Sequence, residues 1–289
     1  MSKKKILIIG YSGGLAQEIN YQLKNLYNLK FLSRQQVDAF TAYKKYFNII
    51  KKFKPSYVVN TIAVNGIKYC EENSEEANFV NGYLPKIIYS YSKKLGFKFI
   101  HFSSDTVFNG KVFKKKYLDH SRPKPSTALG KSKYKSEVFL FNKRNAIIIR
   151  LPMLFGPRHK KHLIYKLLIN LKKNQKTYVS TDVYSTPVYT PNLVSFISKN
   201  IFEKDILFTN KLKNNLINFS SNKYISIFGL MKIFAKYLKK EKYLVSVKDS
   251  FFDKYSIKPK YLGLKSKNKY TTYEPLKLSV KNYLDQINQ

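Results

Sequence analysis

The stretch from Lys4 to Ala16 constrains the fold more than any other part of the chain. Residues 4–10 (KKILIIG) form a short apolar run that ends in glycine, which is typical of a buried parallel strand. The residues that follow, GGLAQEINYQLKNL, carry apolar side chains at helical spacing. Between the two, Gly10, Gly13 and Ala16 form a Gly-x-x-Gly-x-x-Ala turn. A strand, a turn of small residues and a helix in this order predict a dinucleotide-binding unit.

Strand and helix patterns go on alternating through the first half of the 289-residue chain. Further strands are predicted at residues 28–34, 56–63, 97–104 and 145–156, and helices at 39–53, 75–96, 162–173 and 225–240. This order predicts an α/β fold with a Rossmann-like, doubly wound parallel sheet and right-handed crossovers. We expect an NAD(P)-binding domain over residues 1–156 and a smaller C-terminal substrate lobe over residues 157–289, packed on the first and divided from it only approximately.

The formal charge of +37 comes mostly from lysines scattered along the chain, in company with many Asn, Ile, Tyr and Phe residues. Those residue types share A/T-rich codons, and no zinc-finger spacing, RNP-like motif or confined basic block accompanies them, so we expect no nucleic-acid partner. Cys70 is the only cysteine, which excludes an intramolecular disulfide and favours a cytoplasmic location. Because no run reaches about 18 consecutive apolar residues, we expect no membrane partner.

The glycine turn offers backbone N–H groups to a pyrophosphate, and the helix that follows adds the positive end of its dipole. We expect five residues of this turn to bind the cofactor: Gly10, Gly13, Gly14, Leu15 and Ala16. In NAD-preferring folds a carboxylate usually ends the second strand, but this chain has Ser33 and Arg34 there. Because a guanidinium pairs with a 2′-phosphate, these two residues predict NADPH, with NADH as the alternative.

Several longer motifs occur in an order that resembles one family. They are VVNTIAVNGIKYCEEN, NFVNGYLPK, FIHFSSDTVFNGK, PSTALGKSKYKSE and RLPMLFG, followed by TYVSTDVYSTPVYTPNLV and KPKYLGL. This series resembles the extended short-chain dehydrogenases, and most of all the dTDP-4-dehydrorhamnose reductase family. The resemblance implies that a nicotinamide cofactor reduces a nucleotide-linked 4-keto-6-deoxy sugar. It also implies Mg²⁺, which is associated with some members.

The resemblance carries cofactor roles over to residues at the ends of the third and fourth strands. Asn60, Ile62 and Ala63 would line the nicotinamide side of the site, and Ser103 would end the fourth strand beside it. Lys133 stands where the family's lysine grips the nicotinamide ribose and lowers the pKa of a tyrosine.

The same comparison implies that Ser104 and Lys133 are catalytic, and it exposes one departure. Ser104 would hydrogen-bond the substrate carbonyl oxygen, but Leu129 occupies the position of the tyrosine that protonates this oxygen. Ser104, Lys133, a water molecule or Tyr189 from the lobe would have to replace that acid, whereas Asp105 suits loop capping better. The chain is therefore either a reductase with a displaced proton donor or a catalytically impaired binding protein for NADP(H) and a nucleotide sugar.

Besides Ser104, five residues are expected to contact the nucleotide-sugar substrate: Phe108, Arg158, Thr186, Pro187 and Tyr189. Arg158 lies in a basic loop with His159 and His162, which suits a diphosphate. No His, Asp or Glu cluster has metal-ligand spacing, so the residues themselves predict no metal. The sequence leaves the oligomeric state open, a homodimer included.

Overall fold

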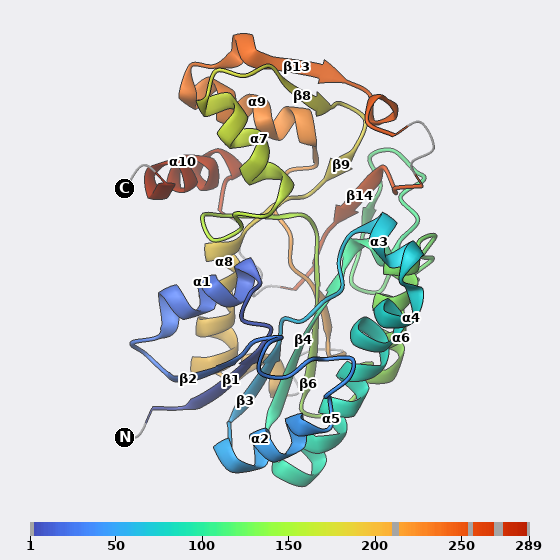
Figure 1. Ribbon diagram of the computed structural model, residues 1–289, viewed down its shortest axis with the longest axis vertical. Helices are drawn as coiled ribbons and strands as arrows, with labels where there is room; N and C mark the ends of the chain where they lie inside the picture. The colour runs from blue at the N-terminus through green and yellow to red at the C-terminus, as the bar shows by residue number, and fades with distance from the viewer. Residues whose placement is uncertain (1–2, 210–213, 254–256, 269–273, 288–289) are drawn as a thin grey trace.

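A six-stranded parallel sheet forms the centre of the molecule (Figure 1). The computed structural model describes residues 3–209, 214–253, 257–268 and 274–287. The strands of the sheet are β1 Lys5–Ile9, β2 Asn28–Leu32, β3 Tyr57–Asn60, β4 Lys98–Ser104, β6 Ala146–Leu151 and β11 Leu216–Asn218. They lie in the order β11-β6-β4-β3-β1-β2, and every neighbouring pair is parallel. The predicted doubly wound α/β fold is confirmed.

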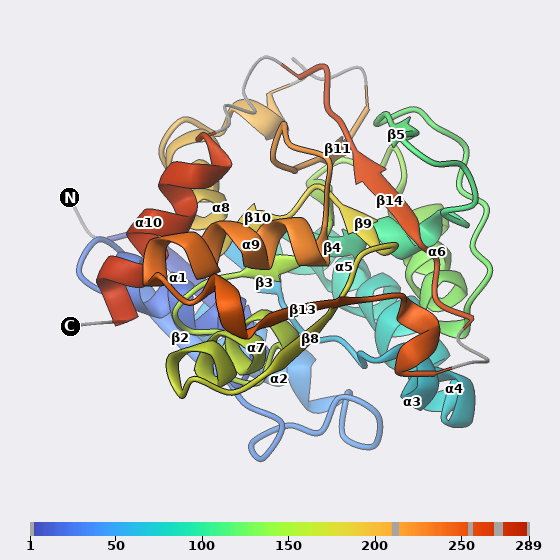
Figure 2. The same ribbon diagram turned by 90° about the horizontal axis from the view of Figure 1, so that it is seen from above.

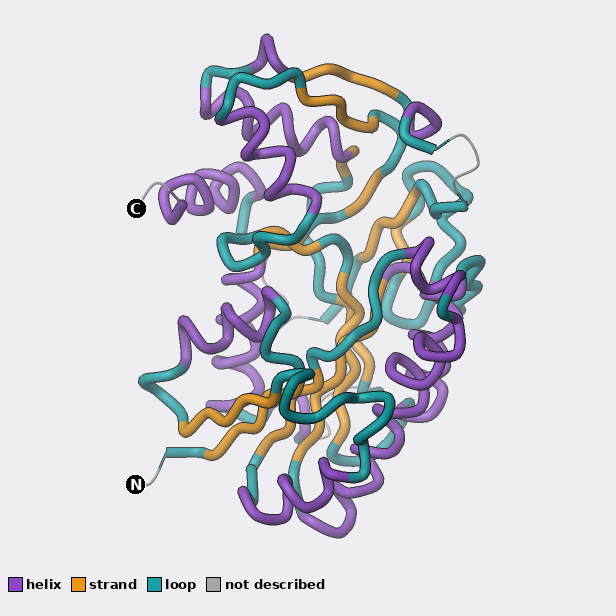
Figure 3. The backbone as a smooth tube through the Cα atoms, viewed as in Figure 1, coloured by secondary structure: helices purple, strands orange, loops and turns teal. Residues whose placement is uncertain are grey.

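Helices cover both faces of this sheet, as Figures 1 and 3 show. Successive side chains of a strand point to opposite faces. Ile6 and Ile8 of β1 therefore enter one core and Leu7 enters the other. This is why the first strand reads as an unbroken apolar run. The helices on the first face are α1 Gly14–Leu23 and α8 Thr190–Ile197, and those on the second are α2 Lys45–Phe53, α5 Leu84–Leu95 and α6 Ala128–Leu140.

The helix predicted at 75–96 is divided into three segments: α4 Ser74–Ala77, the π-helical turn η1 Asn78–Tyr83 and α5. Pro85 lies in the first turn of α5 and has no backbone N–H, so a regular α-helical hydrogen bond to the residue four positions earlier cannot form. The predicted stop is confirmed, because Gly96 ends α5 with φ +74°.

The helix predicted at 39–53 is shorter than expected. Its first residues form a loop because the carboxylate of Asp38 accepts the backbone N–H groups of Phe40 and Thr41, at 2.9 and 2.8 Å. An aspartate that captures local backbone donors competes with helix formation, so α2 begins only at Lys45.

A smaller lobe lies over the carboxyl edge of the sheet (Figures 1 and 2). It is built from α7 Leu163–Lys172, α9 Ile227–Leu238, α10 Leu276–Ile287 and the parallel pair β8 Thr177–Ser180 and β13 Leu244–Val247. The chain crosses between the two parts more than once, since α8 and β11 follow residue 156 yet pack with the sheet. Among the described residues, no helix combines the length and apolar character that a bilayer span requires.

A buried ion pair fastens α6 to the sheet. Arg150 on β6 donates from Nε and Nη2 to the two carboxylate oxygens of Glu137 on α6, at 2.8 and 2.7 Å. Both side chains are 3% exposed. Ser103 at the end of β4 adds a hydrogen bond from its hydroxyl to Glu137, at 2.5 Å. Together these contacts fix the position of α6 along the strand ends.

Replacing Glu137 with alanine is expected to destabilise the protein by about 3–5 kcal/mol, because the Arg150 guanidinium would be left buried without its counter-charge. The free energy of urea-induced unfolding measures the effect. Glu72→Ala, which removes an exposed pair with Lys68, is the matched control and should cost less than about 1 kcal/mol. Equal losses in the two variants would contradict this account of α6.

Candidate active site

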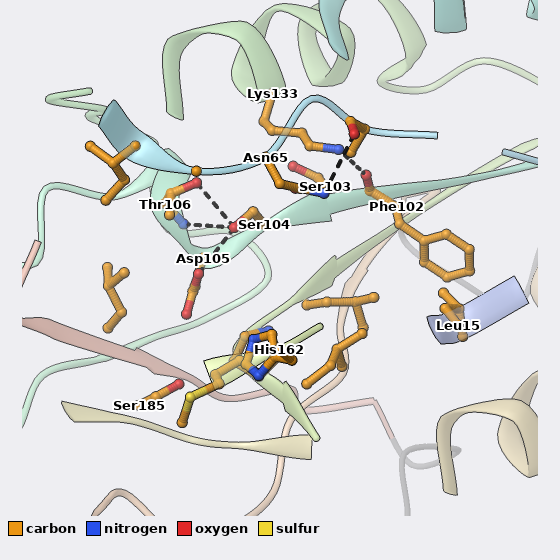
Figure 4. Close-up of a pocket in the computed structure, with 18 of the residues that line it drawn as sticks. Leu15, Asn65, Phe102, Ser103, Ser104, Asp105, Thr106, Lys133, His162 and Ser185 are labelled. Carbon is orange, nitrogen blue, oxygen red and sulfur yellow. Dashed lines mark hydrogen bonds between the residues drawn. The ribbon is translucent and has the colours of Figure 1, made fainter. Parts of the chain in front are cut away.

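A cavity of about 580 Å³ opens at the carboxyl edge of the sheet, beneath the lobe (Figure 4). Its floor comes from the glycine turn and from the ends of β3 and β4, and its roof comes from the loop before α7 and from the lobe. In open parallel sheets ligands bind at this edge, where the chain leaves neighbouring strands in opposite directions. Here that point lies between β1 and β3.

The glycine turn has the shape that its sequence predicts. Gly10 has φ +106°, and a Cβ there would lie 2.8 Å from the backbone nitrogen of Ile62. Gly13 caps α1 and donates its N–H to the carbonyl of Gly10, at 3.1 Å. A Cβ on Gly14 would lie 2.5 Å from the imidazole ring of His159. Gly10 and Gly14 therefore have no room for a side chain. The N-terminus of α1 faces the cavity.

A second cavity of about 260 Å³ continues on the other side of the turn. The two cavities share Gly13, Thr61, Ile62, Ala63 and Asn65, so together they form one trough along the strand ends. This shape suits an elongated dinucleotide better than a compact ligand.

Arg34 lies at the far end of this trough, where the sequence places a 2′-phosphate. Its guanidinium pairs with Asp38 at 2.9 Å and with Glu76 at 3.2 Å, while the side chain stays 70% exposed. These partners hold the guanidinium at the cavity rim. A bound phosphate would compete with the two carboxylates for the same donors.

Lys133 on α6 reaches the nicotinamide end of the trough. Its Nζ donates to the backbone carbonyl of Phe102, at 3.2 Å, and the side chain is almost fully buried (Figure 4). Burial disfavours the charged form and lowers the pKa of the Lys133 ammonium to about 8. Lys133 thus places a buried, hydrogen-bonded ammonium group on the cavity wall.

Three polar residues follow one another at the end of β4. Ser104 lines the cavity, and its Oγ accepts the N–H and the hydroxyl of Thr106, at 3.2 and 3.0 Å. The Ser104 hydroxyl donates to Asp105 Oδ1 at 3.0 Å. Ser104 caps the turn that follows β4, and the Asp105 carboxyl group also accepts local backbone hydrogen bonds, as expected of a loop-capping residue. Asp105 lines the cavity as well.

Two other cofactor-side residues have structural partners. Asn60 is buried and contacts the imidazole of His101 through its amide, at 3.2 Å. Ser103 lines the cavity but is held by Glu137. Ile62 and Ala63 line the cavity as expected. Asn60 instead accepts the backbone N–H of Ile62 and so shapes the loop behind these two residues.

Leu129, at the position of the missing tyrosine, lies at the start of α6 in a small apolar cluster. It packs with Cys70 and Ala77, and the partly buried Ile67 and Val64 cover it. The leucine is 8% exposed. Ile67 also lines the cavity, whereas the leucine itself does not.

The structure does not bring all of the expected substrate residues to the cavity. In the described part of the chain, Thr186 accepts the backbone N–H of Leu264, and Tyr189 packs in the lobe core against Phe155. Pro187 lines a separate cavity of about 20 Å³. On the lobe side, the cavity is lined instead by Tyr184 and Ser185, the two residues of the short strand β9 (Tyr184–Ser185), which directly precede Thr186.

Phe108 and Arg158 also lie elsewhere. Phe108 stacks on Tyr117 with ring centroids 4.0 Å apart, and Arg158 lies over the ring of Tyr21 at 3.9 Å. The neighbouring His159 and His162 line the cavity in place of Arg158. Burial lowers the pKa of each imidazole to about 4, so both are neutral near pH 7.

The described residues contain no group of three or more His, Cys, Asp or Glu side chains placed to hold a metal ion. The Mg²⁺ implied by the resemblance therefore has no ligand set among these residues.

The trough, the glycine turn at its centre and the buried lysine define an oxidoreductase of the short-chain dehydrogenase type. Comparison with known proteins agrees with this class: the model of the RmlD substrate binding domain matches residues 4–288. The chain belongs to that family, which confirms the resemblance seen in the motifs.

Individual relatives are distant. The chain is 28% identical over 205 residues to the spore coat polysaccharide biosynthesis protein SpsK of Bacillus subtilis, covering 68% of this chain and 69% of SpsK. It is 25% identical over 190 residues to a dTDP-4-dehydrorhamnose reductase of Burkholderia thailandensis, covering 65% of this chain and 63% of that enzyme. The alignment thus spans less than two thirds of the second relative.

A solved structure supports the fold over the whole length. The dTDP-4-dehydrorhamnose reductase of Bacillus anthracis, crystallised with NADP, superposes with a TM-score of 0.86 at 20% identity, covering 99% of this chain and 100% of the other.

Replacing Lys133 with methionine is expected to raise the unfolding midpoint at pH 7, because a buried ammonium destabilises the fold. The folded-state pKa of about 8 lies below the ordinary lysine value of 10.5, so the folded protein binds fewer protons than the unfolded chain between these values. The destabilisation is present below about pH 8 and fades towards pH 10.5. Urea titrations of both proteins at pH 7 and pH 10 measure it, and a midpoint difference that does not shrink with pH would contradict it.

Proposed function

We propose that this protein uses NADPH to reduce a nucleotide-linked 4-keto-6-deoxy sugar, most like the conversion of dTDP-4-dehydrorhamnose to dTDP-L-rhamnose. The observation that carries the proposal is the shared cavity: Lys133 and Ser104 face the glycine turn across one space, and the lobe closes its other side. The NADP bound to the structural neighbour and the names of the reductase relatives support the same reaction.

In this reaction, different residues of the chain would bind the cofactor and the substrate. The N–H groups of the glycine turn, at the N-terminus of α1, bind the pyrophosphate. The ammonium of Lys133 hydrogen-bonds the nicotinamide ribose and adds positive charge beside the developing alkoxide. NADPH, when bound, supplies the hydride. Tyr184 and Ser185 from the lobe hold the sugar nucleotide over the nicotinamide and help to exclude water.

One observation favours a second function, that of an impaired NADP(H) and nucleotide-sugar binding protein. Leu129 is built into an apolar cluster with Cys70 and Ala77, so the α6 position that normally carries the acid has a packing role here. A binder needs the trough but no proton donor. We place the reductase first because Ser104 and Lys133 remain at the cavity with their hydrogen-bonding groups.

Restoring a tyrosine tests the choice between the two functions. Wild-type protein is expected to oxidise NADPH when a dTDP-4-keto sugar is added, and Leu129→Tyr is expected to raise kcat at least about tenfold by adding a phenol near Lys133. Absorbance of NADPH in a stopped-flow or steady-state assay measures both rates.

Leu129→Phe is the matched control, since it adds the same ring without the hydroxyl. A gain in the phenylalanine variant equal to that of the tyrosine variant would show that ring packing, not proton donation, raised the rate. Binding of both ligands with no product from the wild-type protein would favour the binding protein instead.

Arg34 is expected to select NADPH. Arg34→Ala should weaken NADPH binding about tenfold, which corresponds to the loss of one charge-assisted hydrogen bond, and leave NADH binding within about twofold. Isothermal titration calorimetry with each cofactor measures the two dissociation constants. An equal loss for NADH would show that Arg34 acts through the shape of the loop and not through the 2′-phosphate.

A further inference from the structure

We propose that Asp105 is the proton donor of this site and takes over the role that Leu129 cannot fill. The proposal rests on the reductase function above, and it assigns a catalytic residue that the family pattern does not supply. Asp105 begins the short 3-10 turn Asp105–Val107, directly after β4.

The place of the carboxyl group is the first argument. Asp105 lines the 580 Å³ cavity together with Ser104 and Lys133, and only 6% of the surface of Asp105 is exposed. Figure 4 shows the side chain extending from the strand end towards the side of the cavity where His162 and Ser185 lie. A substrate held between the sheet and the lobe would therefore meet this carboxyl group.

The direction of the hydrogen bonds is the second argument. The hydroxyl of Thr106 donates to Ser104 Oγ, and the hydroxyl of Ser104 donates to Asp105 Oδ1, each at 3.0 Å. A serine hydroxyl has a single proton, and that of Ser104 is directed to Asp105. Ser104 is thus a positioning residue, and its chain of donors stabilises the carboxylate that remains after Asp105 gives up a proton.

The electrostatic surroundings agree with an acid that works near neutral pH. Burial raises the pKa of the Asp105 carboxyl to about 7, against the hydrogen bonds from Ser104 and the local backbone, which lower it. The other charged and titratable residues that line the same cavity are Lys133 on α6, His159 and His162 before α7, Tyr184 on β9, and Lys258 before β14 (Tyr261–Leu264). Lys258 pairs with Asp249.

The other candidate donors are less well placed. The Nζ of Lys133 donates one hydrogen bond to the carbonyl of Phe102, and its remaining donors are assigned to the nicotinamide ribose in the proposed function. Tyr189 lies in the lobe core between Phe155 and Tyr283, and burial raises the pKa of its phenol. Asp105 combines access to the cavity with a proton that it can release.

The step balances without a further reactant. The hydride of NADPH forms a bond to the carbonyl carbon while the carbon–oxygen π bond breaks. The oxygen takes the proton of the Asp105 carboxyl group, whose O–H bond breaks, and this leaves an alcohol, NADP⁺ and the Asp105 carboxylate. Water returns a proton to the carboxylate before the next turnover.

Asp105→Asn keeps the shape of the side chain but removes its acid. We expect kcat to fall about 10²–10⁴-fold, while the dissociation constant for NADPH stays within about twofold. Asp285→Asn, the same change on the exposed surface of α10, is the matched control and should leave kcat unchanged. The double variant with Leu129→Tyr should recover much of the lost rate, because a phenol then supplies the proton. A structural role for Asp105 would not be rescued in this way.

The pH profile of the wild-type protein tests the proposal without any substitution. An acid must hold its proton to work, so kcat should decrease as the pH rises through about 7, and Leu129→Tyr should move this decline to higher pH. Wild-type kcat that is independent of pH across this range, or that survives Asp105→Asn within about threefold, would overturn the proposal for Asp105 alone. A wild-type protein that oxidises no NADPH with any nucleotide 4-keto sugar would overturn the reductase function as well.

Discussion

The site depends on one buried contact, the pair between Arg150 and Glu137. Arg150 belongs to a central strand and Glu137 to α6, so the pair sets where this helix lies along the sheet. Lys133 is one helical turn before Glu137 and shares its side of α6. Ser103, which also binds Glu137, directly precedes Ser104 on β4. The same contact therefore aligns a cation from α6 with the polar strand end that faces it. If α6 were shifted along the sheet by one helical turn, Lys133 would no longer reach the cavity.

Local sequence pattern predicts the frame of this site well. The apolar run before Gly10, the glycine turn and the helix after it all form as expected, because each is decided by neighbouring residues. The sequence also places Ser104 and Lys133 on the strand end and helix that face the cavity. By contrast, β11 has only three residues, too few for a period-two pattern to stand out, and it joins the sheet from beyond residue 156. Its place depends on pairing with β6, a contact between distant parts of the chain.

The residues that sequence reasoning misplaces lie in the lobe and its loops. The motif around Thr186 marks the right segment, but the residues of that segment that line the cavity are Tyr184 and Ser185 of β9. That choice depends on pairing between β9 and β14, which no local pattern encodes. His159 was expected beside a diphosphate, and the structure places its ring against Gly14 at the start of α1. The side chain thus closes one wall of the glycine turn, and its hydrogen bond with Thr190 ties that wall to α8.

Burial offers a physical route by which this site works without its tyrosine. In water an aspartic acid and a lysine are both charged at pH 7, with pKa values far apart. In this cavity, desolvation raises the pKa of Asp105 to about 7 and lowers that of Lys133 to about 8. The two groups therefore exchange protons with water over nearly the same pH range. A carboxyl group of this kind gives a proton to an alkoxide far more readily than a serine does, and the hydroxyl of Ser104 stabilises the carboxylate it leaves. In the mechanism that we propose, Asp105 at the end of β4 supplies the acidity near neutral pH that the phenol would otherwise provide.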